Sequence, residues 1–114
     1  MKILNRGFIA VTPKAKFIEE VMNHKKQQEI FVPDTPEASI YLIEEDFWDD
    51  EVILKKYFKN LIKAEINQLE PEGNIETKHI DFDSFQDYFD FSMGNIVFDL
   101  ENKPIEGITA DVSD

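Results

Sequence analysis

The clearest chemical signal in the sequence is a histidine followed by two aspartates at alternate positions, His79, Asp81 and Asp83. In an extended chain these side chains project to the same side, so one imidazole and two carboxylates can converge on a cation. Such a metal site would suit Mn²⁺, Mg²⁺ or Zn²⁺, with Asp87 or Asp99 as a further ligand. The simpler interpretation of the same residues is a loop that ends in an N-cap aspartate, with His79 in solvent.

A second candidate is the acidic segment 44–51, in which six acids surround Phe47 and Trp48. The simplest interpretation is a helix N-terminus with both aromatic rings packed inward. Alternatively, the segment is a recognition surface, since tryptophan within a charged rim is a typical interface anchor. A carboxylate pair for acid–base catalysis would need one carboxyl group in an apolar pocket. The predicted partner-binding residues are Glu44, Glu45, Asp46, Trp48, Asp49 and Asp50.

Other kinds of reactive site find little support. No serine lies in a G-x-S-x-G context, and the four glycines are isolated, so the sequence contains no loop that would cradle a phosphate. The absence of cysteine excludes disulfides and thiol chemistry. We therefore predict no catalytic residue and no cofactor, and regard an enzyme as the less favoured class.

Charge is the most unusual property of the composition. The chain of 114 residues has a net charge of −12, and residues 64–114 carry 13 acids against only Lys78 and Lys103. This field repels nucleic acid and anionic lipid and steers basic proteins, although it also serves solubility. No apolar run approaches the roughly 20 residues of a membrane-spanning helix. We predict no nucleic-acid or membrane partner and a cytoplasmic location.

The elements that would position these residues are organised around the stretch 81–100. Its first part is predicted to be an amphipathic helix that Asp83 caps and that Gly94 ends in a left-handed conformation. A buried strand is predicted to follow at residues 96–100. The core of the protein should then be anchored by three aromatic residues on the inner side of this helix, Phe85, Tyr88 and Phe89.

The remaining elements alternate along the chain. Residues 6–11 are predicted to form a strand that is central in its sheet, because its apolar residues are nearly continuous. Thr12–Pro13 has the residue types of an N-cap and a first helical position. A second strand is predicted at 39–44, and a long helix should start inside 44–51 and end near Leu69.

The predicted fold is an α/β (α+β) two-layer sandwich, with helices on one face of a sheet of three or four strands. The element order is β-α-β-α-α-β, with one more strand if the C-terminal residues pair. Residues 1–114 are one domain, in which 101–114 form either an edge strand or a frayed tail. The direction of the last main strand is left open.

Three parts of the chain resemble a group of short acidic bacterial proteins of unassigned function. The likeness is carried by Arg6–Lys14 with Phe17, by Tyr41–Glu44, and by Phe85-x-x-Tyr-Phe89 with Ile96–Leu100. Members of this group have a Phe-His pair just before the last strand, where this chain has Phe91-Ser92. The resemblance implies a compact α/β domain and no particular chemistry.

The favoured functional hypothesis is a non-enzymatic interaction module whose carboxylates dock a basic protein. Such a module would act as an inhibitor, an immunity-like protein or an accessory subunit. The alternative is a small metal-dependent enzyme that uses His79, Asp81 and Asp83. A further alternative is a DNA mimic, which would require carboxylates at phosphate-like spacing. The sequence makes no prediction about the oligomeric state.

Overall fold

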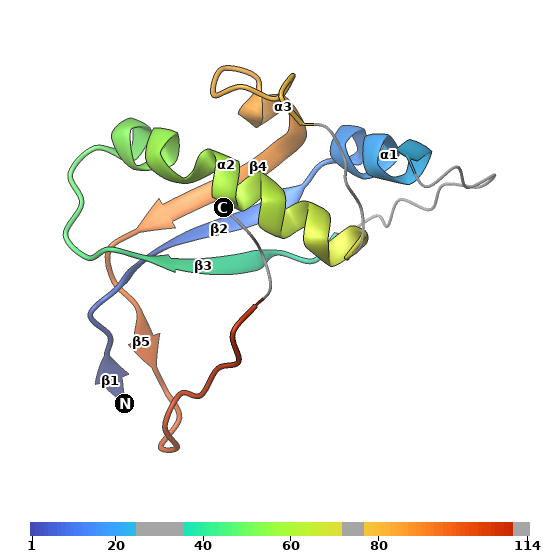
Figure 1. The fold of residues 1–114 in the computed structure, drawn as a ribbon. Helices are drawn as coiled ribbons and strands as arrows, with labels where there is room; N and C mark the ends of the chain where they lie inside the picture. The colour runs from blue at the N-terminus through green and yellow to red at the C-terminus, as the bar shows by residue number, and fades with distance from the viewer. Residues whose placement is uncertain (25–35, 72–76, 111–114) are drawn as a thin grey trace.

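The computed structural model describes residues 1–24, 36–71 and 77–110, and it has an α+β fold (Figure 1). Eight elements follow one another in the order β-β-α-β-α-α-β-β. They are β1 (Lys2–Ile3), β2 (Gly7–Pro13), α1 (Ala15–His24), β3 (Ser39–Ile43), α2 (Asp50–Leu69), α3 (Phe85–Tyr88), β4 (Phe89–Gly94) and β5 (Phe98–Asp99). The prediction of an α+β sandwich is confirmed.

The larger sheet has three antiparallel strands in the order β3-β2-β4, so the strand predicted to be central is central. Ile9 of β2 lies opposite Tyr41 on one side and Met93 on the other. The third strand, β4, is antiparallel to β2, and β5, in the region of the predicted last strand, is antiparallel to β1. Figure 1 shows α2 crossing this sheet, with α1 and α3 near one end of it.

The core lies between the helices and one face of this sheet. Along β2, Gly7, Ile9 and Val11 are buried, whereas the alternate residues are only partly buried. This alternation shows that the strand is covered on a single face. The helices add a group of buried apolar side chains, among them Phe17, Val21, Leu54, Leu61, Ile62 and Phe85.

The predicted start of the first helix is wrong by about two residues. Thr12 and Pro13 belong to β2, where Pro13 lies opposite Phe89 of β4. The next N–H group, that of Lys14, donates to the carbonyl of Tyr88 at 2.8 Å. Tyr88 directly precedes β4, so this hydrogen bond extends the pairing between β2 and β4 by one residue. Pairing with β4 therefore outweighs the local preference of Thr-Pro for a helix start, and α1 begins at Ala15.

The late helix is much shorter than predicted. It is the single turn α3, and the chain is already extended at Phe89. Asp83 does not cap it and Gly94 has no left-handed conformation, since no described glycine has positive φ. The competing signal is alternation: Phe89 and Phe91 turn inward while Asp90 and Ser92 are exposed. The predicted inward rings are confirmed, because Phe85, Tyr88 and Phe89 are buried.

The C-terminal part of the chain lies outside the core. The buried strand predicted at 96–100 is wrong, because β5 has two residues and pairs only with β1. Ile96, Phe98 and Leu100 are exposed. Residues 105–110 form no strand, and the rest of the tail lies outside the described residues.

Candidate interaction site

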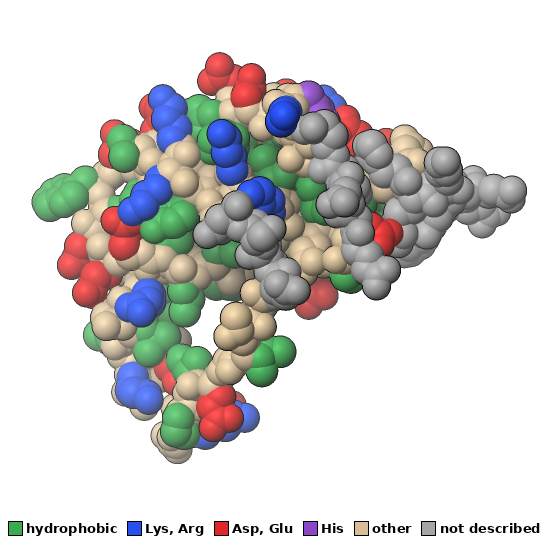
Figure 2. Space-filling view, viewed as in Figure 1, with side chains coloured by type: hydrophobic (Ala, Val, Ile, Leu, Met, Phe, Trp, Pro, Cys, Tyr) green, Lys and Arg blue, Asp and Glu red, His purple; other side chains and the backbone are tan. Residues whose placement is uncertain are grey.

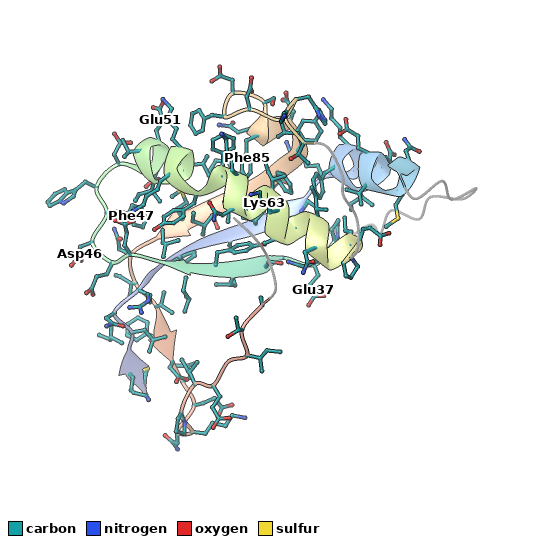
Figure 3. The ribbon with its side chains drawn as sticks, viewed as in Figure 1. Glu37, Asp46, Phe47, Glu51, Lys63 and Phe85 are labelled. Atoms are coloured by element: carbon teal, nitrogen blue, oxygen red, sulfur yellow. The ribbon has the colours of Figure 1, made fainter. Side chains whose placement is uncertain are left out.

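The acidic segment forms the loop that joins β3 to α2, and it is packed onto the sheet through Phe47. This ring is partly buried against the core. It lies directly over Gly7, where an added Cβ atom would be 2.9 Å from a Phe47 ring carbon and 2.9 Å from the Glu44 carbonyl. Figure 3 shows Phe47 on the side of the loop nearer the sheet and Asp46 on its outer side. A glycine in the central strand therefore provides the seat for this loop.

The side chain of Asn95, just after β4, forms hydrogen bonds with the backbone of the loop at Phe47. Its amide oxygen accepts from the Phe47 N–H at 3.2 Å, and its amide nitrogen donates to the Phe47 carbonyl at 3.0 Å. The preceding residue, Asp46, has a φ of 59°, the left-handed region that aspartate tolerates better than most residues. The loop thus has one well-defined conformation, with Phe47 inside.

Asp49 caps the long helix. Its Oδ1 atom accepts from the N–H groups of Glu51 at 2.9 Å and Val52 at 3.4 Å, which satisfies two of the free donors of the first turn. The prediction that this helix starts inside 44–51 is confirmed, and in its first turns Lys55 forms an ion pair with Glu51 at 3.3 Å. The carboxylate of Asp49 is therefore used in building the site.

Glu44 is also used within the protein. It accepts hydrogen bonds from Lys56 Nζ at 2.7 Å and from the Tyr57 hydroxyl at 2.9 Å, both on α2. These hydrogen bonds, with Lys56 first, lower the pKa of Glu44. Two of the six predicted binding residues, Glu44 and Asp49, thus hold the loop and helix together.

The other predicted residues remain open to solvent. Trp48 is 98% exposed, in contrast to Phe47 beside it, so the expectation that both rings pack inward holds for only one of them. Glu45, Asp46 and Asp50 are exposed, and in the described part of the chain no cation pairs with them. Figure 2 shows acidic side chains on the surface around the end of the sheet where this loop lies.

The structure does not gather the predicted metal ligands. His79 Nε2 lies 3.0 Å from a carboxylate oxygen of Glu20 on α1. Asp81 Oδ1 accepts from the Ser84 N–H at 2.8 Å, and this bond lowers the pKa of Asp81. Among the residues that the structure describes, no three His, Asp or Glu side chains come together in a way that could hold a metal ion.

One buried carboxyl group, that of Glu65, was not predicted from the sequence. This residue is 3% exposed, lies between α2 and β3, and accepts hydrogen bonds from the Tyr41 hydroxyl and from Gln68 Nε2, the latter at 2.9 Å. Burial raises the pKa of Glu65, and burial beside this carboxylate also raises the pKa of Tyr41. Its position between Leu61 and Leu69 on the apolar stripe of the helix was the available signal.

Searches against family models, curated proteins and solved structures found no match. Within the described residues, no helix is long and apolar enough to cross a membrane. The resemblance to a group of short acidic bacterial proteins therefore stays a prediction from sequence motifs. Any statement about function must come from the geometry of the loop itself.

Proposed function

We propose that this protein is a non-enzymatic interaction module that docks a basic protein through the loop between β3 and α2. In this role it acts as an inhibitor or as an accessory subunit of its partner. The observation that carries the proposal is Trp48, which is 98% exposed on a loop whose backbone is fixed on both sides of it. Full burial of an indole ring against a partner would contribute about 4–6 kcal/mol before the costs of association.

The fixed loop supports binding because little conformational freedom remains to be lost. Phe47 is clamped by Asn95 and seated on Gly7, and Asp49 is committed to the helix cap. Tryptophan has only two side-chain torsions, so its own ordering costs little. Preorganised aromatic anchors of this kind dominate the energetics of many interfaces.

The charges around the ring define the partner. Glu45, Asp46 and Asp50 form an exposed acidic rim around Trp48, within a chain of net charge −12. Such a rim attracts lysine and arginine side chains and raises the rate of encounter with a basic protein at low salt. The complementary surface is an apolar pocket for the indole ring, bordered by cations.

The test is affinity capture from a cell lysate at low and high salt, followed by titration of the captured protein. Trp48→Ala should abolish capture, whereas Ile108→Ala should leave it unchanged, because Ile108 is 96% exposed but lies outside the loop. Trp48 is the only tryptophan, so its emission should shift to the blue when the purified partner binds. The proposal would be contradicted if the amount of captured protein were the same at low and high salt, or if Trp48→Ala captured as much as the parent protein.

A further inference from the structure

A second exposed surface lies on the two-stranded sheet formed by β1 and β5, which we call the ribbon. Lys2 lies opposite Asp99 and Ile3 opposite Phe98, and the Leu4 N–H donates to the Val97 carbonyl at 2.8 Å. Figure 1 shows the ribbon extending away from the three-stranded sheet and from all three helices. Its strands contain none of the residues of the loop that carries Trp48.

One face of the ribbon is apolar and bare. Ile3 and Phe98 share that face because they are paired, and alternation along the extended chain adds Met1 and Leu100. These four side chains are 71%, 50%, 79% and 76% exposed, in the same order. Figure 2 shows hydrophobic side chains at the surface in this part of the molecule.

An apolar face of this kind is expected to be covered, for two physical reasons. An isolated two-stranded ribbon is at best marginally stable in water, and it needs a further strand or an apolar surface to pack against. In addition, the apolar alternation of Ile96, Phe98 and Leu100 is typical of a strand with one buried face. The described residues leave this face open, so it is available to a surface from a second molecule.

The charges favour a second copy of the same chain as that surface. Residues 1–6 and 95–110 carry three cations, Lys2, Arg6 and Lys103, and three acids, Asp99, Glu101 and Glu106. Their side chains sum to zero, so the remaining residues carry the whole net charge of −12. Two copies that each carry a net charge of −12 repel one another overall. At the ribbon, equal numbers of both signs allow opposite charges to meet across a two-fold axis.

We infer that the apolar face of the ribbon is the contact surface of a two-fold symmetric homodimer. Phe98 and Leu100 of each copy pack against the same residues of the other, and the two ribbons support one another. The Trp48 loop stays outside this contact. Self-association and capture of a basic partner therefore use different residues and can fail independently.

Sedimentation equilibrium from about 1 μM to about 1 mM tests the inference, since weak homodimers fall in this range. The mass should rise from 13.3 kDa toward twice that value, and added salt should favour the dimer by screening the repulsion between two acidic chains. Phe98→Asp should weaken association about tenfold or more. The matched control is Val52→Asp, which adds the same charge at an exposed apolar site on α2 and should leave association unchanged.

Hydrogen exchange gives a second readout that does not depend on a variant. The exchange of the Leu4 amide should slow as the protein concentration rises. The exchange of the Phe47 amide, which donates to Asn95, and the emission of Trp48 should not change. A single 13.3 kDa species over the whole range would overturn the inference. So would a dimer that survives both Phe98→Asp and Leu100→Asp, a dimer lost equally in Val52→Asp, or a ribbon that binds lipid vesicles without self-association.

Discussion

The Trp48 loop and the ribbon both expose aromatic rings, but the rest of the protein supports them very differently. The loop is seated on Gly7, clamped by Asn95 and tied to α2 through Glu44 and Asp49. The ribbon, in the described part of the chain, is held by its own short ladder. The loop is therefore held from several sides, whereas the ribbon would gain support from the dimer contact that we propose.

The two regions also differ in charge, and this difference separates the partners that we propose for them. The loop is acidic throughout, so it favours a basic protein and disfavours another copy of itself. The ribbon is balanced, so it tolerates its own copy. A protein that keeps these surfaces apart can present two Trp48 loops on one dimer, which would raise avidity for a partner with two sites.

The largest effect in this comparison is expected from Gly7→Ala. The new methyl group would lie within about 3 Å of two carbonyl oxygens and the Phe47 ring, and two of these three neighbours are backbone atoms that cannot move away easily. Unfolding in urea should show a loss of about 2–3 kcal/mol. Gly107→Ala is the control, because nothing lies within 4 Å of its added Cβ atom, and it should stay within about 0.5 kcal/mol of the parent. Equal stabilities would show that the seat of the loop is not tight.

A smaller effect, with a distinct pH dependence, is expected from Glu65→Gln at the other end of the contact between α2 and β3. The pKa of Glu65 is raised by burial, so the folded chain binds this proton more tightly than the unfolded chain. Its contribution to stability therefore falls as pH rises from the ordinary carboxyl pKa to the raised value. Each unit of pKa difference corresponds to about 1.4 kcal/mol.

The measurement is the free energy of unfolding of the parent minus that of Glu65→Gln, followed from acid to neutral pH. Glutamine keeps an oxygen that can accept from Tyr41, so the difference isolates the ionisation of the carboxyl group. It should decline with rising pH and then level off. A difference that stays flat across this range would show that Glu65 titrates as an ordinary carboxyl group.

Much of this fold was predictable because its strongest signals are local and agree with one another. The strand around Ile9, the stripe of α2 and the inward rings of Phe85 and Phe89 follow from period and residue type alone. In residues 85–93 the apolar residues fit both a helical period and the alternation of a strand. Pairing with β2 decided between them and shortened the helix to one turn. Sequence alone cannot tell which neighbour a segment will find.

The sequence predicted that a helix begins inside the 44–51 segment, but not which acids of this segment form hydrogen bonds within the protein. The acids of the 44–51 segment look alike in sequence, yet Glu44 and Asp49 form hydrogen bonds within the protein, while Glu45 and Asp46 are exposed and form no ion pair with any described residue. That division depends on contacts with Lys56, Tyr57 and helix N–H groups, which only the folded chain brings together. The inward turn of Phe47 and the outward turn of Trp48 likewise depend on the distant Gly7 and Asn95.

The smallest expected change in stability, and the most direct probe of the loop, comes from Asn95→Ala. This substitution removes both hydrogen bonds to Phe47 but leaves its ring packed on Gly7. The free energy of unfolding should therefore fall by only about 1 kcal/mol. Trp48, the single tryptophan, reports the local effect: its fluorescence anisotropy should fall because the loop gains motion. Asn102→Ala, at an exposed position outside the loop, is the control and should leave the anisotropy unchanged. If Asn95→Ala left the anisotropy at the parent value, the hydrogen bonds of Asn95 would not be what fixes the loop, and the contrast with the ribbon would rest on Gly7, Glu44 and Asp49.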